Sequence, residues 1–149
     1  MQNRMGWNFL IAGVVIFIAA SSSFTLASPE YLKENGVRDG VVVLPSGLQY
    51  EIMVEGNGAK PGPRDVVTTH YHGTLTDGSV FDSSVERRAP ASFPLDRVIA
   101  GWTEGLQLMS VGSKWKFFIP SNLAYGDRRI PGIPPNSTLI FEVELLGIE

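Results

Sequence analysis

Residues 70–84 read HYHGTLTDGSVFDSS, and this stretch decides the fold because it describes a strand, a tight turn and a returning strand. Before the turn, side chains alternate between two faces, with Tyr71 on one face and His70 and His72 on the other. The central Asp-Gly dipeptide is a strong hairpin signal, and the apolar-polar segment after it is typical of a second strand. The stretch therefore predicts an antiparallel hairpin.

Three other segments show the same period of two, which indicates strands with one buried face. They place the following residues on their inward faces: Leu48, Tyr50, Ile52 and Val54; Trp115, Phe117 and Ile119; and Leu139, Phe141, Val143 and Leu145. Glycine- and proline-rich turns separate these strands. The pattern predicts an antiparallel sheet.

Residues 97–109 have the only good helical spacing, with Val98, Trp102 and Leu106 on one stripe. Gly101 and Gly105 weaken this helix, each by roughly 1 kcal/mol relative to alanine. Packing must therefore hold the helix in place. Many strands with one short helix predict an α+β fold in which the helix crosses the inner face of the sheet.

The composition excludes several classes of protein and site. The chain has 149 residues, 44% of them hydrophobic, a net charge of −3 and no cysteine. A packed core is therefore expected, while disulfides, thiol catalysis, cysteine-bound zinc and a basic nucleic-acid surface are not. His70 and His72 lack an evident third metal ligand, so they are interpreted as solvated strand residues and no metal is expected.

The N-terminal 27 residues have the three parts of a secretory signal peptide. Arg4 precedes an uncharged apolar run over residues 7–20, and small residues lead to Ala27. The run is shorter than the roughly 20 residues that span a bilayer, so cleavage after Ala27 is the preferred interpretation. The alternative is an uncleaved anchor over residues 5–29; a buried core helix fits less well, because glycines and serines form helices poorly.

The remaining chain divides into two parts. Residues 28–46 are predicted to be a linker in which one helical turn ends at Gly36. Residues 47–149 carry the strand pattern and are predicted to be a single domain. Six aromatic residues lie on inward faces or beside turns of this domain, and spacing alone does not separate a core role from a binding role: Tyr71, Phe81, Phe93, Trp102, Tyr125 and Phe141.

Four segments in order resemble the FKBP-type peptidyl-prolyl cis-trans isomerases. They are residues 70–84, quoted above, residues 93–106 (FPLDRVIAGWTEGL), residues 109–115 (MSVGSKW), and residues 123–126 (LAYG) with 133–145 (IPPNSTLIFEVEL). Together they cover roughly residues 47–149. The lead-in SGLQY at residues 46–50 is most similar to the bacterial Mip-like branch.

The resemblance implies a strongly curved antiparallel sheet wrapped around one short α-helix, with a pocket between the helix and the concave face. Trp102 would form the floor. The residues that would line the walls are Tyr71, Phe81, Phe93, Val98, Ile99, Ile133 and Phe141. The Tyr125 hydroxyl and the Ile99 amide would donate hydrogen bonds to a bound segment, and Asp82 would bond near Tyr71 at the rim. Tyr71, Asp82 and Tyr125 are thus the candidate catalytic residues.

The resemblance also implies an activity, the acceleration of X-Pro rotation without a cofactor, metal or covalent intermediate. Its expected partners are proline-containing polypeptides, with macrolides such as rapamycin as ligands. With cleavage of the signal, the protein would act on exported proteins in the periplasm or outside the cell; with an anchor, it would face the periplasm from the membrane. The alternative function is a proline-peptide binding module or chaperone with little isomerase activity.

The chain departs from small eukaryotic family members at three places around the implied pocket. Ala91 replaces a bulky aromatic residue, the link from Leu95 to Val98 is about two residues shorter, and residues 128–130 (RRI) replace small residues and a histidine. These changes bear on peptide preference and macrolide affinity. Residues 28–46 are too short for the helical dimerisation region of many Mip-like proteins, which predicts a monomer.

Overall fold

The structure is a computed structural model that describes residues 28–149. The predicted signal peptide or anchor, residues 1–27, lies outside the described residues. The strands are β1 (Val41–Val43), β2 (Gln49–Val54), β3 (Val66–Leu75), β4 (Val80–Ser83), β5 (Ala91–Pro94), β6 (Lys114–Ile119) and β7 (Leu139–Ile148). The helices are α1 (Ser28–Asn35), α2 (Ser84–Arg87) and α3 (Ala100–Leu106), with 3-10 turns η1 (Leu95–Arg97) and η2 (Ser121–Leu123).

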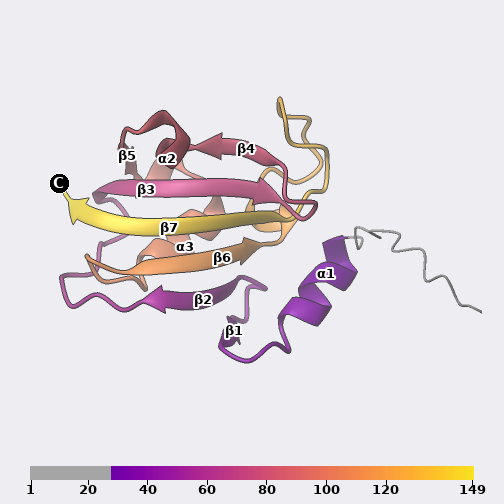
Figure 1. The fold of residues 1–149 in the computed structure, drawn as a ribbon, viewed down its shortest axis with the longest axis horizontal. Coiled ribbons are helices and arrows are strands. Elements are labelled where there is room, and N and C mark those ends of the chain that lie inside the picture. Colours follow the sequence, from indigo (N-terminus) through magenta and orange to yellow (C-terminus); the bar gives the residue numbers. More distant parts are fainter. Residues whose placement is uncertain (1–27) are drawn as a thin grey trace, which may run out of the picture.

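All seven strands belong to one antiparallel sheet (Figure 1). Its order is β1-β2-β6-β7-β3-β4, and β5 also pairs with β3. The predicted hairpin is present: β3 and β4 pair antiparallel around a turn in which Gly78 has a φ of 86°. The α+β fold class expected from the sequence is confirmed.

The core lies between the sheet and α3, which crosses one face of it (Figure 1). The inward residues predicted for β3, β6 and β7 are buried there, and Trp102 and Leu106 of α3 pack against them. The helix is shorter than the predicted residues 97–109, because Val98 is extended (φ −113°, ψ 173°) and separates η1 from α3.

The two glycines of α3 bring the helix close to the sheet. A Cβ atom added at Gly105 would lie 2.5 Å from Cε1 of Phe117, and one added at Gly101 would lie 2.6 Å from Cγ2 of Ile119. Both distances are well inside van der Waals contact. The glycines that weaken the helix by propensity are therefore the residues that allow it to pack.

One predicted inward face is wrong in part. Leu48 is fully buried, but Ile52 and Val54 are 44% and 52% exposed. β1 pairs with β2 only as far as Glu51, and the pairing of β2 with β6 shifts its register between Ile52 and Val54. The alternation at the end of β2 therefore does not lead to burial.

The segment predicted as a linker is structured. α1 and β1 lie beside β2 at one edge of the sheet (Figure 1). Asn35 and Gln49 are both 5% exposed; the Asn35 amide donates to Gln49 Oε1 at 2.8 Å, and Gln49 Nε2 donates to the carbonyl of Leu32 at 2.8 Å. This buried polar contact holds α1 against the sheet. The domain boundary at residue 47 stays a prediction.

α1 also protects the outer face of the sheet. Phe118 points away from the main core, yet it is 1% exposed. The ring of Tyr31 lies 6.5 Å from it, and the guanidinium of Arg38 lies 5.6 Å from its centroid. Its cross-strand partner Ile140 is 8% exposed. Residues 28–46 thus complete a second, smaller apolar cluster.

We expect Gly105→Ala to destabilise the protein. Overpacking a dense core costs roughly 1–3 kcal/mol, which exceeds the roughly 1 kcal/mol that alanine gains over glycine in a helix. Urea unfolding should show a net loss of about 1 kcal/mol or more. Gly147→Ala is the matched control, because an added Cβ there meets no atom within 4 Å; its effect should stay within about 0.5 kcal/mol. A Gly105→Ala protein as stable as the wild type would contradict the packing argument.

We expect Gln49→Ala to release α1 from the sheet. The substitution leaves the buried Asn35 amide without its acceptor, while the Leu32 carbonyl keeps only its bond from the Gly36 N–H. An unsatisfied buried donor costs about 1–3 kcal/mol, and limited proteolysis should then cut within residues 28–46. Gln107→Ala is the control, since Gln107 is half-buried and makes one local hydrogen bond to Thr103; its cost should be below about 1.5 kcal/mol. Equal proteolysis of the two variants would show that the contact does not hold the segment.

Candidate active site

A cavity of about 530 Å³ opens between α3, the concave face of the sheet and the loop that follows β6. Its lining is largely aromatic and aliphatic, with three charged side chains. The residues that line it are Tyr71, Asp82, Phe93, Arg97, Val98, Ile99, Ala100, Trp102, Ala124, Tyr125, Arg128 and Phe141.

Trp102 is the largest buried group beneath this cavity. It is 4% exposed and meets the rings of Tyr71, Phe93 and Phe141 edge to face, with centroids 5.4, 5.6 and 5.3 Å away. Such edge-to-face geometry is favourable for aromatic pairs. Within residues 28–149 the indole Nε1 has no hydrogen-bond partner and is buried among these apolar groups. Apart from this N–H group, the floor of the cavity is formed by packed aromatic rings.

Strand register brings the aromatic wall together. Tyr71 pairs with Val143 across β3 and β7, and Phe93 of β5 pairs with Val67 of β3. Two further rings pack directly against Gly73 of β3. A Cβ atom added at this glycine would lie 2.7 Å from Phe81 and 2.9 Å from Phe141. A glycine inside β3 is thus required for these rings to approach the strand.

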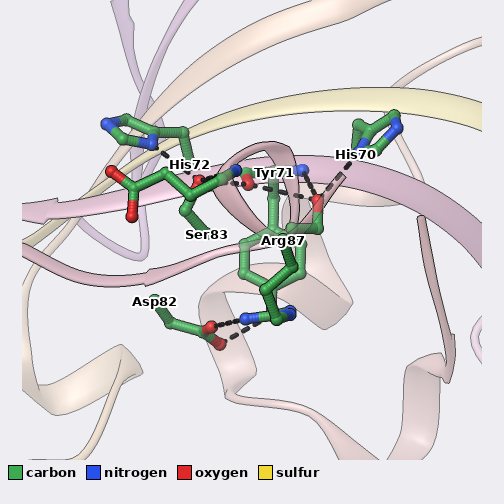
Figure 2. A network of polar contacts seen from close by, with 8 residues as sticks. His70, Tyr71, His72, Asp82, Ser83 and Arg87 are labelled. Carbon is green, nitrogen blue, oxygen red and sulfur yellow. Dashed lines mark hydrogen bonds and ion pairs between the residues drawn. The ribbon is translucent and has the colours of Figure 1, made fainter. Parts of the chain in front are cut away.

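The rim carries a polar network of three side chains (Figure 2). The Tyr71 hydroxyl donates to Asp82 Oδ2 at 2.6 Å, and Arg87 donates through Nη2 to the Tyr71 oxygen at 2.9 Å. Arg87 Nη1 also forms an ion pair with Asp82. The guanidinium lies 5.7 Å from the Tyr71 ring centroid, within cation–π range. The network fixes the edge of Tyr71 that faces the cavity.

Within this network the pKa of Asp82 is lowered and the pKa of Tyr71 is raised. Burial alone would raise the pKa of Asp82, but the hydrogen bonds from Tyr71 and Arg87 and the charge of Arg87 outweigh it and lower that pKa. Burial, followed by the hydrogen bond to Asp82, raises the pKa of Tyr71. At neutral pH the pair therefore consists of an ionised carboxylate and a protonated phenol.

The two histidines anchor α2 rather than stand free in solvent (Figure 2). Nδ1 of His70 lies 3.0 Å from Ser84 Oγ, and Nδ1 of His72 lies 2.8 Å from Ser83 Oγ. Both histidines are half-buried, so the interpretation as solvated strand residues is corrected. The structure shows no group of three or more potential metal ligands within residues 28–149.

Besides the buried Trp102 indole N–H, two further hydrogen-bond donors of the lining have no partner within residues 28–149. Within the described residues, neither the Tyr125 hydroxyl nor the Ile99 backbone N–H donates to another protein group. Ile99 is the N-cap of α3, and Tyr125 lies in the loop that follows β6; both residues line the cavity. Both donors are available to a molecule bound there.

The structure brings eight of the ten predicted site residues to the cavity. The other two are Phe81, which lies behind Phe141 with ring centroids 5.3 Å apart, and Ile133, which lines a neighbouring groove with Leu75. Sequence reasoning missed Arg87, because its position depends on the four-residue helix α2, which no periodic pattern announces. It also missed Arg97 and Ala100, which flank the predicted residues Val98 and Ile99.

Comparison with known proteins gives a consistent match. The family model described as FKBP-type peptidyl-prolyl cis-trans isomerase matches residues 57–146, and a model for the domain amino terminal to such isomerases matches residues 19–52. The FKBP-type isomerase FkpA of Aeromonas hydrophila is 59% identical over 80% of the chain and 45% of its own length. The outer membrane protein MIP of Legionella longbeachae is 53% identical over 80% of the chain and 52% of its own length.

Solved structures agree with this match. The crystal structure of FkpA from Escherichia coli aligns with a TM-score of 0.79 and 48% identity, over 82% of this chain and 57% of that one. The chain spans about half the length of the curated relatives it matches. Among residues 28–149, no helix has the length and apolar character needed to cross a membrane.

We expect Arg87→Met to raise the pKa of Asp82, because burial remains while the compensating cation is lost. A folded-state pKa below the unfolded value stabilises the protein above the unfolded pKa, about 3.9, and this stabilisation is lost as the pH falls through the folded pKa. The stability difference between wild type and variant should therefore be largest above about pH 4 and disappear in stronger acid. Carboxyl carbon NMR titration of Asp82 measures the shift directly.

Arg88→Met is the control for this experiment, since Arg88 is exposed and its side chain makes no ion pair within residues 28–149. The Arg88→Met substitution should leave the pKa of Asp82 unchanged. An unchanged Asp82 pKa in Arg87→Met, or an equal shift in both variants, would remove Arg87 from the network.

Proposed function

The chain belongs to the family of FKBP-type peptidyl-prolyl cis-trans isomerases, and on that premise we propose that its cavity accelerates rotation about X-Pro peptide bonds. The observation that carries the proposal is the aromatic-floored cavity whose lining includes two unpartnered donors, the Tyr125 hydroxyl and the Ile99 N–H. It is large enough for a proline ring and the residues beside it. Tyr71, Asp82 and Tyr125 are the proposed catalytic residues.

The barrier to rotation about an X-Pro bond comes from amide resonance. Rotation of a peptide bond costs about 18–20 kcal/mol, because it breaks the amide resonance that keeps the bond planar. Resonance separates charge, so the planar amide is more dipolar than the twisted one. Transfer from water to an apolar site therefore disfavours the planar ground state more than the twisted transition state. The ring wall around Trp102 supplies such a site.

Positioning supplies the second contribution. A hydroxyl at Tyr125 and an amide at Ile99 can each hold a carbonyl of the bound segment while the central bond turns. The Tyr71–Asp82–Arg87 network keeps the rim in one arrangement. No proton transfer is required, and a ten-thousandfold acceleration needs only about 5.5 kcal/mol of differential stabilisation.

The proposed substrates are proline-containing segments of exported proteins, for which X-Pro isomerisation is slow enough to limit folding. The apolar residues 7–20 and the name of the Legionella relative as an outer membrane protein support a location in the cell envelope. Of the two proposed wall residues outside the lining, Phe81 packs against the lining residue Phe141, and Ile133 lines the neighbouring groove. A macrolide such as rapamycin is the proposed competing ligand, and a monomer stays the prediction of the sequence.

We expect Tyr125→Phe to lower kcat/KM for short X-Pro peptides about three- to tenfold, because one hydrogen bond contributes roughly 0.5–1.5 kcal/mol. A protease-coupled or NMR exchange assay on the purified protein measures the rate, and rapamycin should abolish it. Tyr50→Phe is the matched control: Tyr50 stacks on Trp115 at 4.5 Å, away from the cavity, and its hydroxyl has no partner among residues 28–149.

Two outcomes would change the proposal. Full activity in Tyr125→Phe would remove that hydrogen bond from the mechanism, and full activity in a folded Asp82→Leu protein would do the same for the carboxylate. No rate above background in the folded wild-type protein would favour a proline-peptide binding module or chaperone.

A further inference from the structure

Three charged residues line the cavity, and only one of them is paired. Asp82 is held by Arg87 and Tyr71. Arg97 and Arg128 are exposed, and within residues 28–149 neither has a carboxylate within 4.0 Å or a side-chain hydrogen bond. On a chain with a net charge of −3, the mouth of this cavity is therefore locally cationic.

The two arginines come from two different segments that line the cavity. Arg97 ends η1 and directly precedes Val98 and Ile99. Arg128 lies three residues after Tyr125, and its backbone N–H donates to the Tyr125 carbonyl at 3.2 Å, which closes a turn. A segment bound by the Ile99 and Tyr125 donors would thus have one arginine next to each donor.

The acidic residues next to these arginines are not paired with them. Asp96 and Asp127 adjoin the arginines in sequence, but they are exposed, do not line the cavity and form no ion pair with either arginine. The Asp82 carboxylate is already engaged by Arg87. The two guanidinium groups keep their charge at any physiological pH and can each hold a carboxylate through paired N–H donors.

We propose that Arg97 and Arg128 form a specificity subsite that favours client segments carrying Asp or Glu beside the X-Pro unit. This inference rests on the proposed function, since it assigns the flanking residues of the same substrate. Because both arginines are exposed, each contact contributes modestly, about 0.2–1 kcal/mol, and is weakened by salt. The preference is therefore graded and electrostatic.

The test uses matched peptides with a Leu-Pro core in which Glu, Gln or Lys stands two residues before or two residues after the proline. Both kcat/KM and Kd are measured on the full chain at low and high ionic strength, where the Debye length is about 30 Å and about 3 Å. For the wild type at low salt we expect the order Glu, Gln, Lys, with Glu favoured over Gln about 1.5- to fivefold. High salt should bring this ratio close to one.

The double variant Arg97→Gln/Arg128→Gln should also bring the ratio close to one. Arg129→Gln is the control, since Arg129 is the next residue in the same loop but lines the neighbouring groove; it should keep the preference. A wild-type ratio near one at low salt would overturn the inference, as would an equal loss of preference in Arg129→Gln.

The neutral peptide separates this inference from the proposed function. If the Gln peptide is isomerised and the Glu peptide is not preferred, the proposed arginine subsite is wrong while the proposed isomerase activity stands. If no peptide is isomerised, the proposed activity fails, and the Glu-to-Gln ratio of Kd values still decides whether the arginines select acidic segments.

Discussion

The close approach of α3 to the sheet is the constraint on which the rest of the structure depends. Gly105 and Gly101 let the helix backbone rest on Phe117 and Ile119, at distances that no larger residue allows. This depth places Trp102 against the rings of the concave face. A helix lifted by one methyl group would separate the indole from those rings. The floor of the cavity is therefore a consequence of two residues that local propensity alone would count as defects.

Much of the fold could be predicted because its strands obey one rule. In β3, β6 and β7, alternation identifies the buried face, since each strand has a neighbour on both sides and α3 beneath it. The rule fails at Ile52 and Val54, where β1 is too short to continue the sheet. The helical turn predicted to end at Gly36 is the last turn of α1 (Ser28–Asn35). Its packing against the sheet was not predicted, because the contact that holds it is a buried polar pair, Asn35 and Gln49, and hydrophobic patterns do not detect such pairs.

The candidate site was predictable to the extent that it is made of strand and helix faces. Family motifs give the aromatic residues, and the strand register then brings Tyr71, Phe93 and Phe141 around Trp102. Arg87 could not be placed in the same way. Its guanidinium reaches Asp82 only because α2 turns the chain back beside β3, through serine hydroxyls that bond the histidines of that strand.

The cavity has two parts that differ in charge: an aromatic floor around Trp102 and an exposed part with charged side chains. Under the proposed function the floor should stay apolar, because an exposed charge there would stabilise the dipolar planar amide relative to the twisted one. The Asp82 carboxylate lies at the rim, where it is paired with Arg87. With its pKa lowered and that of Tyr71 raised, neither group changes protonation state near neutral pH. Among the described residues that line the cavity, the charges without an ion-pair partner belong to Arg97 and Arg128, which are exposed. In the proposed subsite they would act on the residues that flank the X-Pro bond.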